Sequence, residues 1–100
     1  MVRKIIWTNN AQEDFKQVIE YLYEEWSERI ALNFIATFYS KIELIDKLPQ
    51  IGMKVENHEI VNRILITKHN ILYYLITEKE IVLLDLFDTR QNPEKNKFRN

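Results

Sequence analysis

The chain has 100 residues, of which 46% are hydrophobic and 12% aromatic, and its net charge is −1. This size and apolar content suit a single domain over residues 1–100 and exclude an intrinsically disordered chain. The near-neutral charge argues against a basic domain that attracts nucleic acid by its overall field. The absence of cysteine excludes disulfides, thiol nucleophiles and thiolate metal sites, and it suits a cytoplasmic protein.

No segment predicts a membrane span or a secretory signal. The N-terminal apolar run covers only Ile5, Ile6 and Trp7, and the longest apolar run, 71–76, has the length of a strand. A membrane-spanning helix needs roughly 20 apolar residues, and a signal peptide needs a longer apolar region than this one. We therefore expect a soluble cytoplasmic protein without a membrane partner.

The chain is expected to begin with a short strand over residues 3–7, followed by a helix. Asn10 and Glu13 stand three residues apart, as in a capping box at a helix start. Apolar residues then recur every three or four positions, so that they share one face of the helix. They are Ala11, Phe15, Val18, Ile19, Leu22 and Trp26.

A second helix is expected to follow immediately. Ser27 is a suitable N-cap, and Pro49 ends the helix. The tight turn after Trp26 requires the two helices to fold back as an antiparallel hairpin. The apolar stripe of the second helix comprises Ala31, Phe34, Phe38, Ile42, Ile45 and Leu48.

The remaining chain predicts three strands, over residues 59–67, 71–77 and 81–88. They are rich in Ile, Val, Leu and Tyr and are separated by polar breaks of three residues, which is typical of an antiparallel meander. The element order is therefore β-α-α-β-β-β. Packing one face of the sheet on the helical hairpin gives a two-layer α+β domain.

Alternation along the last strand divides its side chains between two faces of the sheet. One set contains a charge, so we assign it to the face turned away from the helices, called the open face below. This set is Ile81, Leu83, Asp85 and Phe87. Arg63 is assigned to the same face, where it either contacts a partner or pairs with Asp85. Because an apolar face rarely stays uncovered, we expect a partner on it.

The last strand ends in a polar segment, DTRQNP at 88–93, in which Pro93 cannot join a strand ladder. We expect it to hold Arg90 at the rim of the open face. Lys95, Lys97 and Arg99 follow as a basic tail, which either faces an anionic partner or is solvated. His58 and His69 are isolated in polar loops, so neither a metal site nor a cofactor is predicted.

The order of these features resembles the RelE/ParE superfamily, the toxins of bacterial toxin–antitoxin pairs. The motifs that carry the resemblance are LPQIG at 48–52, Arg63 followed by aliphatic residues, ILYY at 71–74 and TRQNP at 89–93. The resemblance implies a toxin that a cognate antitoxin neutralises. A disordered antitoxin segment would cover the open face and the hairpin, with contacts to Leu83, Asp85 and Phe87.

The long hairpin and the PQIG segment at 49–52 are similar to the ParE-like branch. That branch implies a toxin that is not an enzyme and that inhibits DNA gyrase. The cations expected to contact the target are Arg63, Arg90, Lys95, Lys97 and Arg99.

The alternative is a RelE-like endoribonuclease that cuts mRNA on the ribosome, with Arg63 and Arg90 as catalytic cations. Such a nuclease needs a proton acceptor and cations around one phosphate. Here Ile71 stands where relatives often carry arginine, and the chain does not close with Tyr or His-Tyr. A third interpretation is a degenerate, non-toxic relative that only binds protein.

Overall fold

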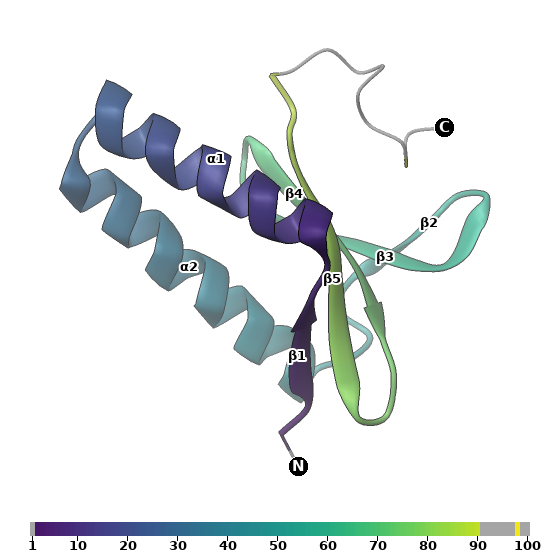
Figure 1. Ribbon diagram of the computed structural model, residues 1–100. Coiled ribbons are helices and arrows are strands. Elements are labelled where there is room, and N and C mark those ends of the chain that lie inside the picture. Colours follow the sequence, from purple (N-terminus) through teal and green to yellow (C-terminus); the bar gives the residue numbers. More distant parts are fainter. Residues whose placement is uncertain (1, 91–97, 99–100) are drawn as a thin grey trace.

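A computed structural model describes residues 2–90 and 98 and shows two layers, a helical hairpin and a five-stranded sheet (Figure 1). This confirms the predicted α+β fold. The sheet order is β1-β5-β4-β3-β2. The elements are β1 (Lys4–Trp7), α1 (Asn9–Glu25), α2 (Glu28–Lys47), β2 (Met53–Val55), β3 (His58–Thr67), β4 (Asn70–Ile76) and β5 (Glu80–Asp88).

The N-cap of α1 is Thr8, so the expected start at Asn10 is wrong. The Thr8 hydroxyl accepts a hydrogen bond from the backbone N–H of Ala11 at 3.1 Å, and it donates toward the Leu83 and Leu84 carbonyls at 2.8 and 3.0 Å. Thr8 therefore caps the helix and joins it to β5. The asparagines at 9 and 10 are also suitable N-cap residues. The sequence alone does not show that the Thr8 side chain reaches a strand.

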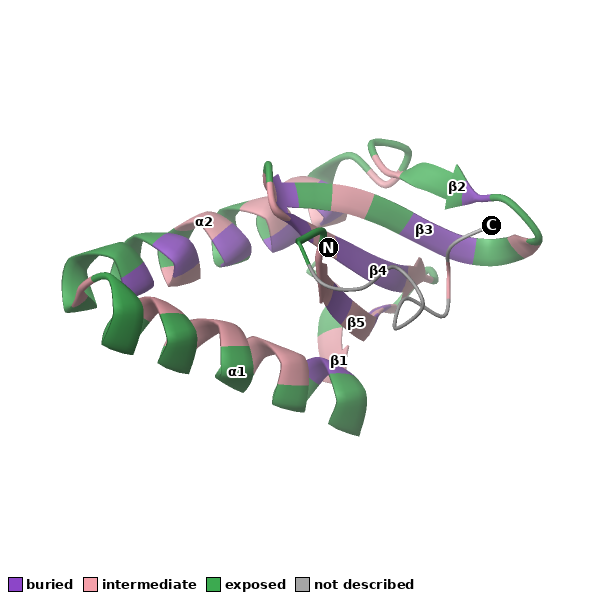
Figure 2. Cartoon of the chain, turned by 90° about the horizontal axis from the view of Figure 1, so that it is seen from above, coloured by how far each residue is buried: buried purple, intermediate pink, exposed green. Residues whose placement is uncertain are grey.

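The hairpin forms as predicted. Ser27 caps α2, because its hydroxyl accepts a hydrogen bond from the N–H of Ile30 at 3.1 Å. The helix ends at Lys47, two residues before Pro49. The two helices run side by side in opposite directions, and their connection extends beyond the sheet (Figures 1 and 2).

The meander has four antiparallel strands and not the expected three, because β2 pairs with β3. A two-residue turn joins them, and Asn57 in that turn has a φ of 66°, a conformation that asparagine tolerates well. At the other edge, β1 pairs in parallel with β5, from Lys4 opposite Glu80 to Trp7 opposite Leu83. The complete sheet is therefore mixed.

The main core fills the space between the hairpin and the sheet. Buried positions recur along α2 (Figure 2), and the rings of Phe15 and Phe38 lie 4.8 Å apart. Trp7 of β1 stacks on Phe38 with ring centroids 5.5 Å apart. The buried members of this core are Ala11, Phe34, Phe38, Ile42, Ile45, Ile66, Leu72, Tyr74, Ile81, Leu83 and Leu86.

Because of a β-bulge in β5, the predicted assignment of side chains to the two faces of the sheet is wrong for the first half of this strand. Tyr74 pairs with Leu83 while the preceding Tyr73 pairs with Asp85, so Leu84 is an extra residue. Leu83 is 0% exposed and lies in the core under the helices, so placing it on the open face was wrong, as it was for Ile81. Before the bulge the odd-numbered residues of β5 face the core, and beyond it they face away from the helices.

Asp85 and Phe87 lie beyond this bulge and face away from the helices. Asp85 is in register with Tyr73, and Phe87 packs against the second apolar cluster, which lies on the open face. The expected positions of Asp85 and Phe87 are therefore correct. Beyond the end of β1, helix α1 also contacts β5, because the Asp14 carboxylate accepts a hydrogen bond from the N–H of Leu86 at 3.0 Å.

Gly52, the only glycine of the chain, is required by a close approach of another side chain. A Cβ at this position would collide with the Tyr74 hydroxyl and come within 3.2 Å of the Arg63 carbonyl oxygen. The glycine of the PQIG segment therefore makes room for a buried ring. In the described part of the chain, no helix is both long and apolar enough to cross a membrane.

Candidate functional site

Arg63 lies on the open face, as predicted, in a row of side chains that crosses the sheet. It is in register with Tyr73 on β4, which is in register with Asp85 on β5. Arg63 and Asp85 are thus two strands, roughly 10 Å, apart, and the pair between them, one of the two alternatives for Arg63, does not form. The Arg63 side chain is exposed and makes no hydrogen bond or ion pair with any described residue.

The open face is partly covered by the chain itself. The Phe98 ring stacks on Tyr73 with centroids 4.7 Å apart and makes a T-shaped contact with the His58 ring, with centroids 5.4 Å apart. Tyr73 is consequently only 2% exposed. The apolar cluster on this face comprises Val55, Val61, Ile71, Tyr73, Leu75, Leu84, Phe87 and Phe98. Sequence reasoning missed this cover, although Phe98 was visible as the one aromatic residue in a polar tail.

Arg90 lies against the hairpin and not at the rim of the open face, which corrects the prediction. Its backbone N–H, Nε and Nη2 all donate to the Asp88 carboxylate, at 2.8, 3.0 and 2.9 Å. Its guanidinium carbon stands 5.8 Å from the centre of the Tyr21 ring on α1. Residues 89–90 form a turn after β5, in which the Asp88 carboxylate accepts a hydrogen bond from the backbone N–H two residues later.

The Asp88–Arg90 pair is electrostatically favourable. Burial raises the pKa of Asp88, but the hydrogen bonds and charge of Arg90 outweigh it and hold that pKa below its ordinary value. The hydrogen bond to Asp88 raises the pKa of Arg90. The pair fixes the direction of the guanidinium without burying it, since the Arg90 side chain remains 46% exposed.

Of the predicted target-binding cations, the two that the structure describes, Arg63 and Arg90, are not brought together. Arg63 faces away from the helices and Arg90 faces them, so the sheet lies between them. Lys95, Lys97 and Arg99 lie outside the described residues. Among the residues described, no group of three or more His, Asp or Glu side chains could hold a metal ion.

A cleft of about 480 Å³ separates the far end of the hairpin from the β3–β4 turn. We call it the hairpin–turn cleft. Arg90 stands at its rim. The helix side of its lining is mostly apolar, with Asn33 and Thr37 as its polar members, and the turn side is polar. The lining residues are Leu22, Trp26, Ile30, Asn33, Phe34, Thr37, Thr67, Lys68, His69, Asn70 and Arg90.

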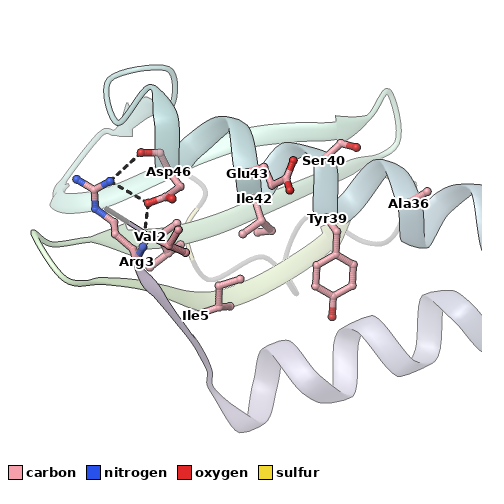
Figure 3. Close-up of a pocket in the computed structure, with 10 residues that line it drawn as sticks. Val2, Arg3, Ile5, Ala36, Tyr39, Ser40, Ile42, Glu43 and Asp46 are labelled. Carbon is pink, nitrogen blue, oxygen red and sulfur yellow. Dashed lines mark hydrogen bonds and ion pairs between the residues drawn. The ribbon is translucent and has the colours of Figure 1, made fainter.

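A second cavity, of about 370 Å³, lies between β1 and α2 (Figure 3). At one end Arg3 pairs with Asp46 at 3.1 Å and also donates to the Asp46 and Thr77 carbonyls at 2.8 Å. Desolvation raises the pKa of Asp46, but the hydrogen bonds and charge of Arg3 lower it by more. The pKa of Asp46 therefore lies below its ordinary value. The pair ties β1 to the end of α2, which is a structural role.

Comparison with known families supports the resemblance inferred from the motifs. Residues 5–93 match a family described as the ParE toxin of type II toxin–antitoxin system, parDE. No curated protein matches the chain.

Solved toxin structures share the fold. The chromosomal ParDE toxin–antitoxin system from P. aeruginosa aligns with a TM-score of 0.72 and 13% identity, over 89% of this chain and 98% of that chain. The YoeB dimer from Staphylococcus aureus gives 0.65 and 16%, over 87% and 97%. The E. coli DinJ–YafQ toxin–antitoxin complex gives 0.61 and 9%, over 88% and 93%.

At such identities these structures establish the fold alone. The family match, by contrast, covers most of the sequence, from β1 to the polar segment after β5. The chain therefore belongs to the ParE toxin family of type II toxin–antitoxin systems, within the RelE/ParE superfamily.

Proposed function

We propose that the protein acts in the cytoplasm as a growth-inhibiting toxin that binds DNA gyrase, without itself being an enzyme, and that a cognate antitoxin neutralises it. The observation that carries the choice of target is the separation of Arg63 from Arg90. Cleavage of RNA needs cations and a proton acceptor around one phosphate. Two arginines on opposite sides of a sheet cannot meet at one phosphate, but each can contact a protein surface.

The target surface in this proposal includes Arg63 on the open face and Arg90 beside the hairpin, with Lys95, Lys97 and Arg99 as further cations. Arg63 supports a contact role because it is exposed and its charge is not neutralised by a described residue. An arginine of this kind can form a bidentate pair with a partner carboxylate.

The antitoxin surface in this proposal includes Asp85 and Phe87 on the open face. Leu83 supports that surface from the core side, since the bulge turns it inward. Two of the similar structures are a ParDE toxin–antitoxin system and a DinJ–YafQ complex, which favours an antitoxin partner for this chain as well.

The first test is colony survival after expression from a tightly repressed promoter, with and without the neighbouring small gene. We expect killing that the neighbour rescues. Purified protein should then inhibit supercoiling by gyrase while transcripts on translating ribosomes stay intact. Cleaved transcripts would replace this target with the ribosome-dependent nuclease, and harmless expression of soluble protein would leave a degenerate binding relative.

A charge-reversal pair sharpens the test. Arg63→Glu should weaken gyrase inhibition by about tenfold or more, because it places a carboxylate where a cation meets the target. Lys79→Glu is the matched control, since Lys79 is exposed in the β4–β5 turn and its side chain makes no hydrogen bond or ion pair with a described residue. Equal inhibition by both variants would remove Arg63 from the target surface.

A further inference from the structure

A third cavity, of about 350 Å³, lies between the sheet and the segment that follows α2. We call it the loop–sheet cavity. Gly52 lines it from that segment, Lys54 from β2 and Asn62 from β3, and Ile76 and Glu78 line it from β4 and the turn that follows. Its volume is at the small end of the range for ligand pockets, roughly 300–1,000 Å³. The cavity therefore suits a small molecule.

Asn62 is a polar residue on the wall that the sheet supplies. It is only 6% exposed, and its side chain makes no hydrogen bond with any described residue. Burial of an amide without a hydrogen-bond partner lowers stability, so packing of the fold does not account for this residue. Because Asn62 lines the cavity, its amide can bond to a molecule held there. The amide oxygen accepts hydrogen bonds and the NH₂ group donates them, so Asn62 suits a ligand with both kinds of group.

The free charges that line the cavity are one of each sign. Lys54 and Glu78 are exposed, and neither side chain makes a hydrogen bond or ion pair with a described residue. The remaining charge, that of Arg3, is already paired with Asp46 at 3.1 Å (Figure 3). A ligand that satisfies both free groups carries one positive and one negative charge and is neutral overall.

The fold holds these two charges apart, with Asn62 between them. In the sheet order, β3 lies between β2, which carries Lys54, and β4, which leads into Glu78. Arg3 donates to the carbonyls of both Asp46 and Thr77 at 2.8 Å, so the end of α2 lies on the Glu78 side. A helix C-terminus favours a cation. The positive group of the ligand is therefore expected at the Glu78 end and its negative group at the Lys54 end.

We infer that the loop–sheet cavity binds a free α-amino acid with a short polar side chain. Its ammonium pairs with Glu78 and its carboxylate with Lys54, and the Asn62 amide bonds to the polar groups between them. Pro49 and Ile76 are the only apolar side chains among the described residues that line the cavity, which disfavours a large aliphatic or aromatic ligand. A nucleotide is also disfavoured, because its phosphate would face Glu78 with a single free cation to neutralise it.

This inference is independent of the proposed function. Asn62 and Arg63 are neighbours in β3, so their side chains lie on opposite faces of the sheet. None of the side chains that line the loop–sheet cavity was assigned to the target surface or to the antitoxin surface. A ligand that binds only the folded protein raises its stability by mass action, whether or not the protein is toxic.

Gly52 provides a direct readout, because it lines the cavity and is the only glycine of the chain. Cell-free synthesis with ¹⁵N-glycine therefore gives a single backbone amide signal. We expect at least one of the probes L-serine, L-threonine, L-asparagine and L-glutamine to shift this signal saturably. The N-acetyl derivative lacks the ammonium and the carboxamide derivative lacks the carboxylate. Each should bind about tenfold more weakly or worse, because hydrogen bonds between charged groups are lost.

Three variants test the assigned roles. Lys54→Gln and Glu78→Gln should each weaken binding by about threefold to tenfold. Their matched controls, Lys68→Gln and Glu59→Gln, are at exposed positions outside the cavity and should leave binding unchanged. Asn62→Leu should abolish the shift while its melting temperature stays at or above that of the wild type, because the amide has no described hydrogen bond to lose.

Several results would overturn the inference. They are an unmoved Gly52 signal with all four amino acids, equal binding of the N-acetyl or carboxamide derivatives, and unweakened binding by both charge variants or by Asn62→Leu. A shift caused by adenosine monophosphate in place of the amino acids would make the cavity a nucleotide site instead. The colony-survival test is separate: harmless expression with a responsive Gly52 signal removes only the toxin function, and rescued killing with an unresponsive signal removes only the amino-acid site.

Discussion

The hydroxyl of Tyr74 is buried against Gly52 and has no hydrogen-bond partner among the described residues. Burial raises the pKa of this phenol above its ordinary value, because the charged phenolate would lose its hydration. The folded state therefore favours the protonated form more than the unfolded state does. Its contribution to stability is complete below the unfolded pKa of about 10 and is lost as the pH rises through the folded pKa.

Tyr74→Phe should make the protein less sensitive to alkali. At pH 8 the free energy of unfolding should change by less than about 1 kcal/mol, because the hydroxyl has no bond to lose. Between pH 9 and 11 the wild type should lose stability faster than the variant, a difference that urea unfolding can measure. Parallel pH curves for the two proteins would contradict the argument.

Residue-level prediction from the sequence succeeded for exposed charges and failed for paired ones. Arg63 was placed correctly because alternation along a regular strand sets the direction of its side chain. Arg90 was misplaced because a turn that Asp88 makes with its own neighbour sets its direction. Such a turn depends on which of several local hydrogen bonds forms, and the residue pattern alone does not decide it.

At the scale of elements, both helices and the strands β3 to β5 were predicted from periodicity, and the cap of α2 from Ser27. β2 was missed because it has only three residues, and exposed Met53 and Lys54 show no alternation. The bulge at Leu84 was missed for a different reason. One extra residue in an apolar run leaves no trace in composition, yet it reversed the faces of Ile81 and Leu83.

The two helix caps are expected to differ in energetic weight. Ser27→Ala should cost about 1 kcal/mol, the usual value for an exposed N-cap. Thr8→Ala should cost roughly 2 kcal/mol or more, because it also leaves the partly buried Leu83 and Leu84 carbonyls without the hydroxyl donor. Chemical unfolding of the two variants measures the difference, and equal losses would show that the link from Thr8 to β5 contributes nothing.

At the scale of the whole molecule, Phe98 connects the C-terminal part of the chain to the open face. Its ring stacks on Tyr73, and the cluster around it joins β2, β3, β4 and β5. The hairpin therefore covers one side of the sheet, and this cluster buries part of the other, where Arg63 and Leu65 stay exposed. The sequence predicted that the open face would be covered, but not that the chain supplies part of the cover.

Phe98→Ala should lower the free energy of unfolding by about 1–2 kcal/mol, because an aromatic contact and its buried area are lost. The near-ultraviolet circular dichroism of the folded state should change as Tyr73 becomes exposed, while the helical signal stays constant. Lys79→Glu serves as a control at an exposed position away from this cluster. If Phe98→Ala is as stable as the wild type, the ring contributes no net stability to the sheet.

The parallel pairing of β1 with β5 has a consequence for the timing of folding. Residues 3–14 bond to the sheet side of the molecule through residues 77–86, by way of Arg3, β1, Thr8 and Asp14. Contacts so distant in sequence form slowly, because a long loop must close before they yield any stabilisation. Most of the chain must therefore leave the ribosome before the N-terminal segment can pair with β5. Until then the nascent chain lacks the complete sheet, so the folded protein forms only late in translation.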